Sequence, residues 1–436
     1  MFNKNKNAFL FTDILQKGLG RAFDYIAQHK HNKEKIRQDL LSACLHNVAY
    51  DPQCESTRAE WLFELINLTN DIEFYRKNIF QALPIAQEFW DINQLYDLVS
   101  IWAKQGCLEA KKIIYQTFKQ QEFNESWLGG EHIIAIEGIQ GLLAVAEIVG
   151  ARLIEDNELW EDDYLITQAS AIFDKNLVIE SIEKEAVNNS KVKAYLDSVK
   201  TYQENTLKQK EDRKKSKNNT IDINTIIEKI EQKKYRGYVL SRFGRDATKQ
   251  EIDRVFEKLL SETRKEQLIR YLHVFRYRKL PKLDIRLFDL AKSDDEEIQL
   301  PAIAALAVNK DDSLHNLAIN LIKQQPKSIN NRVLKLLINN YQSDDFKIIE
   351  SILNKSHDID LRHEIGMDLI DIIDKQKTAE LINCSLWVYE NTPCSYCRQE
   401  ILKILIESKQ VSQNILEECL HDCSPAIRAI SKSKIY

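Results

Sequence analysis

Cationic and aromatic residues alternate in one stretch of the chain, and this pattern suggests a binding site. Arg and Lys side chains can neutralise phosphates, while Tyr rings stack on unpaired bases. The same residues could instead form core packing and solvated helix faces, or could contact an acidic protein segment such as the chain's own N-terminal block. The residues concerned are Lys233, Lys234, Arg236, Arg242, Arg245, Arg270, Tyr271, Arg276, Tyr277, Arg278 and Lys279.

The charge distribution makes this stretch a basic island in an acidic protein. Residues 200–290 contain 24 Lys and Arg against 14 Asp and Glu, whereas the whole chain has a net charge of −5. Acidic residues prevail over 1–199 and over 291–436. Such patterning favours an acidic or phosphate-bearing ligand for the middle of the chain.

Cysteines near the end of the chain have spacings that metal sites use. Cys394 and Cys397 are separated by two residues, and Cys419 and Cys423 enclose His421. Thiolates and an imidazole from stacked turns could close a tetrahedral zinc site. However, Cys397 and Cys419 fall on apolar helix faces, where a buried cysteine commonly acts as a small hydrophobic residue. We therefore expect no metal or other cofactor. We also expect no redox role for the C-x-x-C pair, because no βαβ unit surrounds it.

Two further polar segments match functional motifs only in part. The acidic residues between Glu155 and Asp163 lack the alternating oxygen ligands and central glycine of a calcium loop, so we interpret them as a solvated loop and helix start. The segment 126–132 contains two glycines but no following Lys-Ser/Thr of a phosphate-binding loop. The chain also lacks H-E-x-x-H, G-x-S-x-G and G-x-G-x-x-G signatures. The sequence therefore predicts a protein that is not an enzyme and has no small-molecule substrate.

Helices are the elements that must position these residues. The chain has only 11 Gly and 7 Pro among 436 residues, and almost every segment repeats its apolar residues at helical period. An all-β fold is improbable for such a chain, and its composition is that of a globular protein. We predict an all-α protein in two blocks: an N-terminal helical-repeat domain over 1–203, a basic polar linker or solvated helix end over 204–222, and a C-terminal repeat array over 223–436.

Pairs of helical segments recur in the last third of the chain. Equivalent positions early in each second helix are spaced by 30 to 36 residues, at Gln299, Asn330, Arg362, Arg398 and Arg428. One helix pair is too small to bury its own apolar face, so neighbouring pairs must stack to form a core. The repeat therefore predicts an α-solenoid of stacked antiparallel helix pairs.

These repeats resemble the HEAT-repeat family of armadillo-like α-solenoids. Residues 358–362 (DIDLR) and 422–428 (DCSPAIR) match the family pattern of an acidic turn, an apolar residue and an arginine. The resemblance covers 283–436 well and 223–282 loosely, and Gln299 and Asn330 depart from it. It implies one long concave surface and a structural role for the repeat arginines, which in that family bond acidic side chains of neighbouring turns. These arginines are Arg362, Arg398 and Arg428.

Two smaller expectations follow from the repeat. His363 comes directly after a repeat arginine and is expected on the surface of its helix. The short final helix, from Ala426 to Tyr436, is polar on one side and is expected to cap the solenoid, because terminal repeats need a polar outer face.

We therefore expect a non-enzymatic scaffold or adaptor. It would bind a partner protein on its concave surface and an acidic or phosphate-bearing ligand on the basic island. The alternative is nucleic-acid binding by the curved solenoid, and a second alternative is an enzyme of the HEAT-like DNA glycosylase or chromophore-lyase kind. The short apolar run near the start is too brief for a secretory signal and the cysteines are sparse, so we expect a cytoplasmic location without membrane contact. The Asn-, Lys- and Ile-rich composition suggests a bacterial source.

Overall fold

Helices form every regular element of the chain that the structure describes. The structure is a computed structural model that describes residues 10–29, 33–120, 125–216, 223–232, 237–324, 332–353 and 358–435. These residues form 27 α-helices and two short 3₁₀ helices, with no strand among them. The prediction of an all-α protein is therefore confirmed. None of the helices in these ranges combines the length and the apolar character needed to cross a lipid bilayer.

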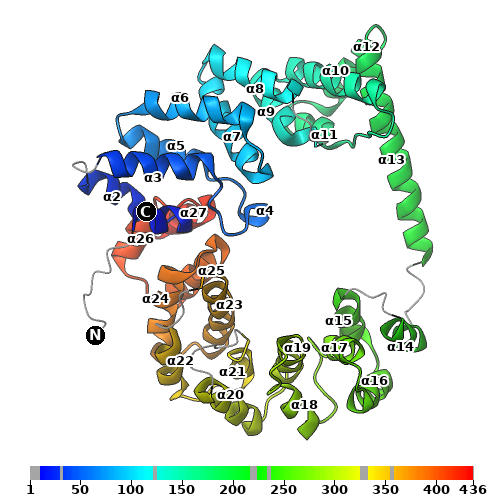
Figure 1. Ribbon diagram of the computed structural model, residues 1–436, viewed down its shortest axis with the longest axis vertical. Helices are drawn as coiled ribbons and strands as arrows, with labels where there is room; N and C mark the ends of the chain where they lie inside the picture. Colours follow the sequence, from blue (N-terminus) through cyan, green and yellow to red (C-terminus); the bar gives the residue numbers. More distant parts are fainter. Residues whose placement is uncertain are drawn as a thin grey trace. The chain divides into compact units, whose positions relative to one another are not determined.

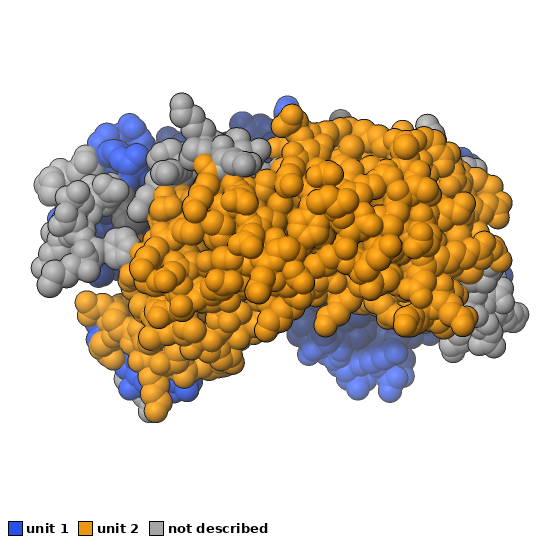
Figure 2. Space-filling model, turned by 90° about the horizontal axis from the view of Figure 1, so that it is seen from below, with its two compact units in different colours: residues 1–218, 417–436 blue, residues 219–416 orange. Residues whose placement is uncertain are grey.

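The chain divides into two compact units, which Figure 2 shows in different colours. Unit 1 contains residues 1–218 together with 417–436, and unit 2 contains residues 219–416. The sequence placed all of 223–436 in one C-terminal array, whereas the structure joins residues 417–436 to the N-terminal unit. Unit 2 is therefore inserted into the sequence of unit 1.

The helices of unit 1 pack around one continuous apolar core that extends from Phe11 to Val199. In chain order, α3 contacts α5, α5 contacts α7, α7 contacts α9, α9 contacts α10, and α10 contacts α13. The bounds are α1 (Phe11–Lys17), α2 (Arg21–Gln28), α3 (Lys33–Leu45), α4 (Pro52–Glu55), α5 (Ala59–Leu68), α6 (Ile72–Ala82), η1 (Leu83–Ile85), α7 (Phe89–Lys104), α8 (Leu108–Gln120), α9 (Trp127–Glu137), α10 (Ile139–Glu155), α11 (Tyr164–Ile172), α12 (Lys175–Ala186), α13 (Ser190–Ser216) and α27 (Pro425–Ile435).

The helices of unit 2 form two rows. In the first row α15, α17, α19, α21, α23 and α25 each contact the next, and in the second row α16, α18, α20 and α24 pack on first-row helices (Figure 1). The bounds are α14 (Ile223–Glu231), α15 (Gly237–Asp246), α16 (Lys249–Ser261), α17 (Lys265–Val274), α18 (Ile285–Leu290), α19 (Glu296–Ala307), α20 (Asp312–Gln324), α21 (Lys335–Asn340), α22 (Asp345–Leu353), α23 (Ile359–Gln376), η2 (Ala379–Leu381), α24 (Ile382–Asn391), α25 (Ser395–Glu407) and α26 (Gln413–Cys419), which leads back to unit 1.

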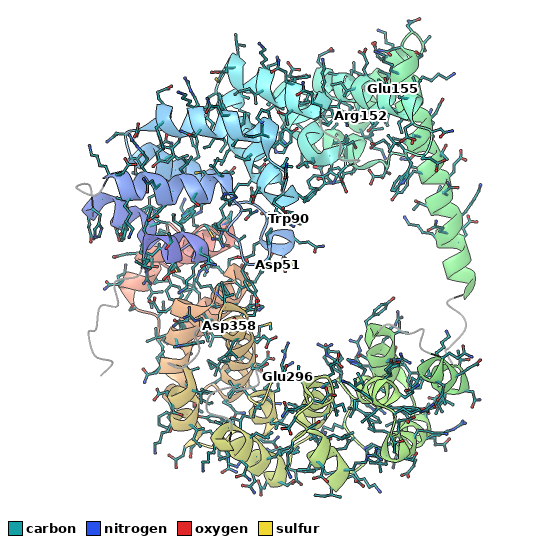
Figure 3. All side chains as sticks on the ribbon, in the orientation of Figure 1. Asp51, Trp90, Arg152, Glu155, Glu296 and Asp358 are labelled. Carbon is teal, nitrogen blue, oxygen red and sulfur yellow. The ribbon has the colours of Figure 1, made fainter. Side chains whose placement is uncertain are left out.

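Aspartates begin several helices of unit 2. The Asp295 carboxylate accepts a hydrogen bond from the backbone N–H of Glu297, and the Asp358 carboxylate accepts one from Leu361 at 2.8 Å. Such caps satisfy N–H groups that have no partner within the helix. In Figure 3, Glu296 and Asp358 lie at the N-terminal ends of α19 and α23. These are the starts of second helices in the repeat that the sequence reveals.

The expected linker begins as a helix. α13 continues to Ser216, so residues 204–216 form a helix end rather than an irregular segment. The first part of α13 buries Val192, Tyr195 and Val199 against the core, whereas Leu207 is 60% exposed. Of the two interpretations of 204–222, the solvated helix end therefore describes its helical part, and residues 217–222 lie outside the described ranges.

Residues 417–435 are held against the first helices of unit 1. The Arg21 guanidinium donates two hydrogen bonds to the Glu418 carboxylate, each 2.8 Å long. The Trp61 indole N–H donates to the backbone carbonyl of His421 at 2.9 Å. The sequence predicted that the last helix caps the preceding repeats, whereas the structure packs α27 in unit 1.

A candidate cationic interaction surface

The residues of the basic island lie on two helices of unit 2 and on the segment that follows the second of them. α15 carries Arg242 and Arg245, α17 carries Arg270 and Tyr271, and residues 276–279 follow α17. Three residues of the predicted patch lie outside the described ranges, namely Lys233, Lys234 and Arg236.

A glycine lets α15 approach the end of α17 closely. A Cβ atom on Gly244 would lie 1.9 Å from the carbonyl oxygen of Val274, so a larger residue would force the two helices apart. The Ser241 hydroxyl donates to the carbonyl of His273 at 3.0 Å, and the Arg278 guanidinium donates to the carbonyl of Arg245 at 3.4 Å. These contacts bring residues 242–245 beside residues 276–279.

The result is a cluster of cations around one tyrosine. The Cζ atoms of Arg245 and Arg276 lie 5.6 Å and 5.4 Å from the centre of the Tyr277 ring, within the range of a cation–π interaction. The Tyr277 side chain is 55% exposed, and both arginines are also exposed. We call this cluster the arginine surface, and it consists of Arg242, Arg245, Arg276, Tyr277, Arg278 and Lys279.

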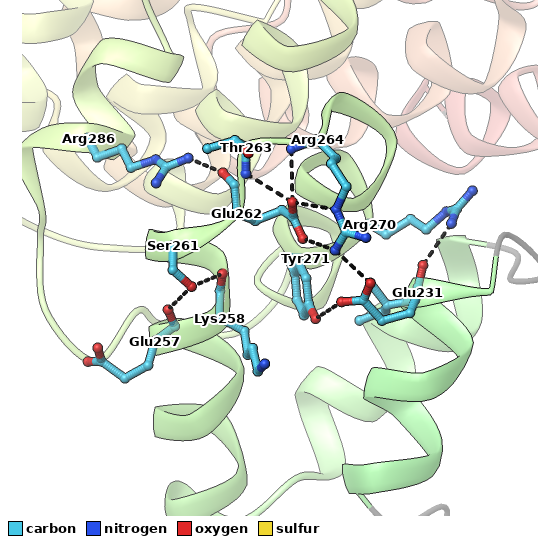
Figure 4. Close-up of polar contacts among 11 residues, drawn as sticks. Glu231, Glu257, Lys258, Ser261, Glu262, Thr263, Arg264, Arg270, Tyr271 and Arg286 are labelled. Atoms are coloured by element: carbon cyan, nitrogen blue, oxygen red, sulfur yellow. Dashed lines mark hydrogen bonds and ion pairs between the residues drawn. The ribbon is translucent and has the colours of Figure 1, made fainter.

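Two predicted binding residues point into the fold instead. Tyr271 is completely buried, and its hydroxyl donates to the Glu231 carboxylate at 3.2 Å. Burial, followed by the Glu231 charge, raises the pKa of Tyr271. The Arg270 guanidinium donates to the backbone carbonyl of Ile230 at 2.8 Å (Figure 4). Arg270 and Tyr271 therefore fasten α14 to α17, and we do not include them in the arginine surface.

Glu262 is the centre of the polar contacts drawn in Figure 4. Its carboxylate accepts hydrogen bonds from the backbone N–H groups of Thr263 and Arg264, both at 2.9 Å, and from the Arg264 guanidinium. Arg264 also pairs with Glu231 at 2.6 Å. The side-chain bond from Arg264 is the main reason that the pKa of Glu262 falls to about 2.

Replacing Glu262 by glutamine is expected to destabilise unit 2 by about 1 kcal/mol at pH 7, because this ion pair is partly solvated. The stabilisation from a carboxylate with a lowered pKa is complete above its unfolded pKa near 4.5 and disappears as the pH falls towards 2. The difference in the free energy of unfolding between the unmodified chain and Glu262→Gln, measured with urea, should therefore shrink between pH 5 and pH 3. Glu257→Gln, at an exposed position of α16, is the control. An equal loss of stability in both variants would contradict the stabilising role of the ion pair between Glu262 and Arg264.

The structure brings together two segments that the sequence treated separately. The Ser126 hydroxyl donates to the carboxylate of Glu161, which belongs to the acidic run 155–163. We interpreted that run as solvated, yet Glu161 is buried, and burial raises its pKa to about 7. The backbone N–H of Glu161 also donates to the Ser198 hydroxyl at 2.8 Å. The contact therefore joins the start of α9 to α13.

A histidine in unit 1 has a carboxylate partner that the sequence did not reveal. The Nε2 atom of His132 lies 2.8 Å from Oδ1 of Asp97, and the Thr57 hydroxyl donates to the same carboxylate. The His132 ring is buried and stacks on Tyr96. The carboxylate lies between the histidine and the hydroxyl, so the imidazole does not activate Thr57 as a nucleophile. These residues lie far apart in the sequence and on different elements, so no motif indicates that they meet.

The repeat arginines differ in their surroundings. Arg398 is fully buried near the start of α25, and Arg362 is half-buried near the start of α23. Arg428 lies in unit 1, where its guanidinium contacts the Glu64 carboxylate at 3.2 Å. Gln299 takes the equivalent place on α19 and is buried, whereas Asn330 lies outside the described ranges.

The cysteines of the zinc hypothesis divide between the two units. Cys394 and Cys397 lie at the start of α25 in unit 2. Cys419 and Cys423 belong to unit 1, where the backbone N–H of Cys423 donates to the carbonyl of Gly18 at 2.9 Å. Comparison of the sequence with protein-family models gave no match, and a search of the curated proteins found no similar sequence.

Proposed function

We propose that this chain is a non-enzymatic interaction protein whose arginine surface binds an acidic or phosphate-bearing segment of a partner protein. The observation that carries the proposal is that Arg245 and Arg276 are both exposed and both lie within cation–π distance of the exposed Tyr277 ring. Within the described part of the chain, the one carboxylate paired with this surface is Asp246, at 3.9 Å from Arg242. Guanidinium groups bind carboxylates and phosphates through two parallel hydrogen bonds, so the surface is suited to an anionic ligand.

The extent of the positive region favours a short ligand. Burial lowers the pKa of Lys335 on α21, and the charges of Arg332 and Arg276 lower it further, against the opposing effect of Asp368. Arg276 therefore acts on α21 electrostatically. The Arg332 guanidinium lies 3.5 Å from the Glu364 carboxylate and 4.0 Å from the Asp368 carboxylate of α23. Carboxylates on α23 therefore limit how far positive charge extends beyond the arginine surface. A surface of this extent suits a peptide segment better than a long nucleic-acid duplex.

The packing of unit 2 supports a solenoid. The first-row helices contact one another in succession, and second-row helices cover them, as expected for stacked antiparallel helix pairs. We propose that these pairs form an α-solenoid of the HEAT kind and that its concave face contributes apolar contacts to the same partner. The arginine surface then forms part of the charged rim, as in other protein interfaces.

A triple charge reversal tests this function. Arg242→Glu, Arg245→Glu and Arg276→Glu together should weaken partner capture from a native lysate at least tenfold, because like charges would then face an anionic segment. The matched control reverses three exposed cations on α16 of the same unit, namely Lys249, Arg254 and Lys258. The control changes the net charge equally and should capture the partner as the unmodified chain does.

Nuclease treatment separates the two kinds of ligand. A stoichiometric protein that survives nuclease and is lost only in the Arg242/Arg245/Arg276 variant would support the proposal. Material that disappears with nuclease and in raised salt would show instead that the arginine surface binds nucleic acid, with Tyr277 available for stacking on a base. Equal capture by all three proteins would refute a role for the arginine surface.

A further inference from the structure

Two cysteines and a histidine come together in unit 2. The sulfur atoms of Cys394 and Cys397 and a ring nitrogen of His363 all lie within 4.8 Å of one another. The cysteines lie at the start of α25, and His363 is the fifth residue of α23. α24 separates these two helices in the chain, and α23 contacts both α24 and α25. The three side chains therefore meet through the packing of consecutive repeats.

The geometry of the α24–α25 turn places both thiols on one side. Cys394 is the N-cap residue of α25, and Cys397 lies three residues later, almost one helical turn away. The backbone N–H of Arg398 donates to the carbonyl of Cys394 at 3.2 Å, which begins the helix. The backbone N–H of Cys394 lies 3.4 Å from the hydroxyl oxygen of Thr392, a residue that is completely buried. These two contacts fix the spacing of the two cysteines at the start of α25.

The surroundings suit a metal that prefers thiolates. Cys394 and Cys397 are each 7% exposed, whereas His363 is half-buried, so an ion could reach the group from the histidine side. The first turn of a helix carries partial positive charge, which stabilises thiolate over thiol. Buried cysteines alone would be explained as small hydrophobic residues. That explanation does not account for an imidazole nitrogen placed beside both sulfurs.

We propose that His363, Cys394 and Cys397 form a zinc site. In tetrahedral zinc coordination with bonds of about 2.3 Å to sulfur and 2.0 Å to nitrogen, the ligand atoms are about 3.5–3.8 Å apart. Since no two of these atoms are more than 4.8 Å apart, the three side chains need to close by at most about an ångström to reach this geometry. Two thiolates and one imidazole bind zinc in preference to calcium or magnesium, which prefer oxygen ligands. Each cysteine gives up its thiol proton on binding, so the affinity rises with pH.

The fourth coordination position is supplied from outside this group. In the part of the chain that the structure describes, no further His, Cys, Asp or Glu joins these three. Water or a donor atom of a bound partner would therefore complete the site. The ion would link the start of α23 to the start of α25, which are joined in the chain only through α24 and its turns. This role is independent of the arginine surface.

Metal titration of the full chain tests the site. The reduced, metal-free protein should bind one Zn²⁺ in competition with a chromophoric chelator, and Co²⁺ should give the absorption bands of tetrahedral thiolate coordination. His363→Asn, at a half-buried position that tolerates a polar side chain, should weaken zinc binding by about 100-fold or more. Mutating a residue that only hydrogen-bonds to a metal ligand already lowers metal affinity by about 10–100-fold, and His363 is itself a ligand. Cys397→Ser should abolish the thiolate bands of Co²⁺ as well.

Two controls and one stability measurement keep the test decisive. Cys54→Ser changes an exposed cysteine and Cys384→Ala changes a buried cysteine of the same unit, and both should bind zinc as the unmodified chain does. Zinc should also slow hydrogen exchange in the first turns of α23 and α25, but not in the His363→Asn variant. Absence of stoichiometric binding, binding unchanged by His363→Asn, or a Cys394–Cys397 disulfide that persists in reductant would each overturn the proposal.

Discussion

Replacing Asp368 by asparagine is expected to stabilise unit 2, and to do so more strongly at pH 8 than at pH 5. Asp368 is 1% exposed, and neither of its carboxylate oxygens has a hydrogen-bond partner among the described residues. Its nearest ion-pair contact is the Arg332 guanidinium, at 4.0 Å. Burial raises the pKa of Asp368 to about 7, and the charges of Lys335 and Arg332 only partly offset this effect.

The sign of the pH dependence follows from the raised pKa. The folded protein keeps Asp368 protonated up to about pH 7, whereas the unfolded chain releases the proton near pH 4. Between these values folding takes up a proton, so stability falls as the pH rises, by up to about 1.4 kcal/mol per pH unit. Asparagine cannot ionise and does not incur this cost. The stabilisation by Asp368→Asn should therefore be about 2–3 kcal/mol larger at pH 8 than at pH 5.

Urea unfolding of the two proteins at pH 5, 6, 7 and 8 measures this difference. Asp374→Asn is the matched control, since it makes the same change at an exposed position of the same helix. The control should change the free energy of unfolding little, with no trend over this pH range. A constant difference between Asp368→Asn and the unmodified chain at all four pH values would show that Asp368 is ionised throughout.

Helical period and composition were sufficient to predict the all-α fold, because each helix buries its own apolar stripe locally. The same reasoning could have separated the basic island into its two parts. Tyr271 follows Leu268 by three residues and precedes Phe275 by four, so it shares their buried face of α17. Tyr277 lies beyond the end of α17 and does not share that face. An alternation of cations and aromatics does not show which side chains point outward, whereas the helical period does.

Contacts between distant segments could not be predicted in this way. An apolar stripe shows that a helix face is buried, but not which element covers it. Residues 425–435 have the pattern of a repeat helix, yet the partner of Arg428 is Glu64 at the other end of the chain. The group of His363, Cys394 and Cys397 was also missed, although here the repeat offered a signal. In the repeat alignment, His363 follows one repeat arginine and Cys397 precedes the next, so that alignment contained the signal that the two positions can stack.

Replacing Gly20 by alanine is expected to destabilise unit 1 by about 3 kcal/mol, by displacing the C-terminal segment. A Cβ atom on Gly20 would lie 1.9 Å from the backbone carbonyl oxygen of Glu418. Gly20 has φ −57°, which any residue adopts, so the cost comes from this contact and not from backbone strain. A carbonyl cannot rotate away as a side chain does, and the segment must move as a whole. The two bonds between Arg21 and Glu418 and the bond between Trp61 and His421 would then weaken together.

Hydrogen exchange and urea unfolding together distinguish displacement from general destabilisation. In Gly20→Ala, exchange should accelerate over residues 417–435 and in α2, while α23 of unit 2 keeps its protection. Gly106→Ala is the control, because Gly106 has φ +92° and, apart from its chain neighbours, no atom of the described residues lies within 4 Å of the added Cβ. That variant should lose only about 1 kcal/mol through backbone strain, without faster exchange over 417–435. If Gly20→Ala left exchange in this segment unchanged, the segment would not depend on the close contact at Gly20, and its inclusion in unit 1 would need another cause.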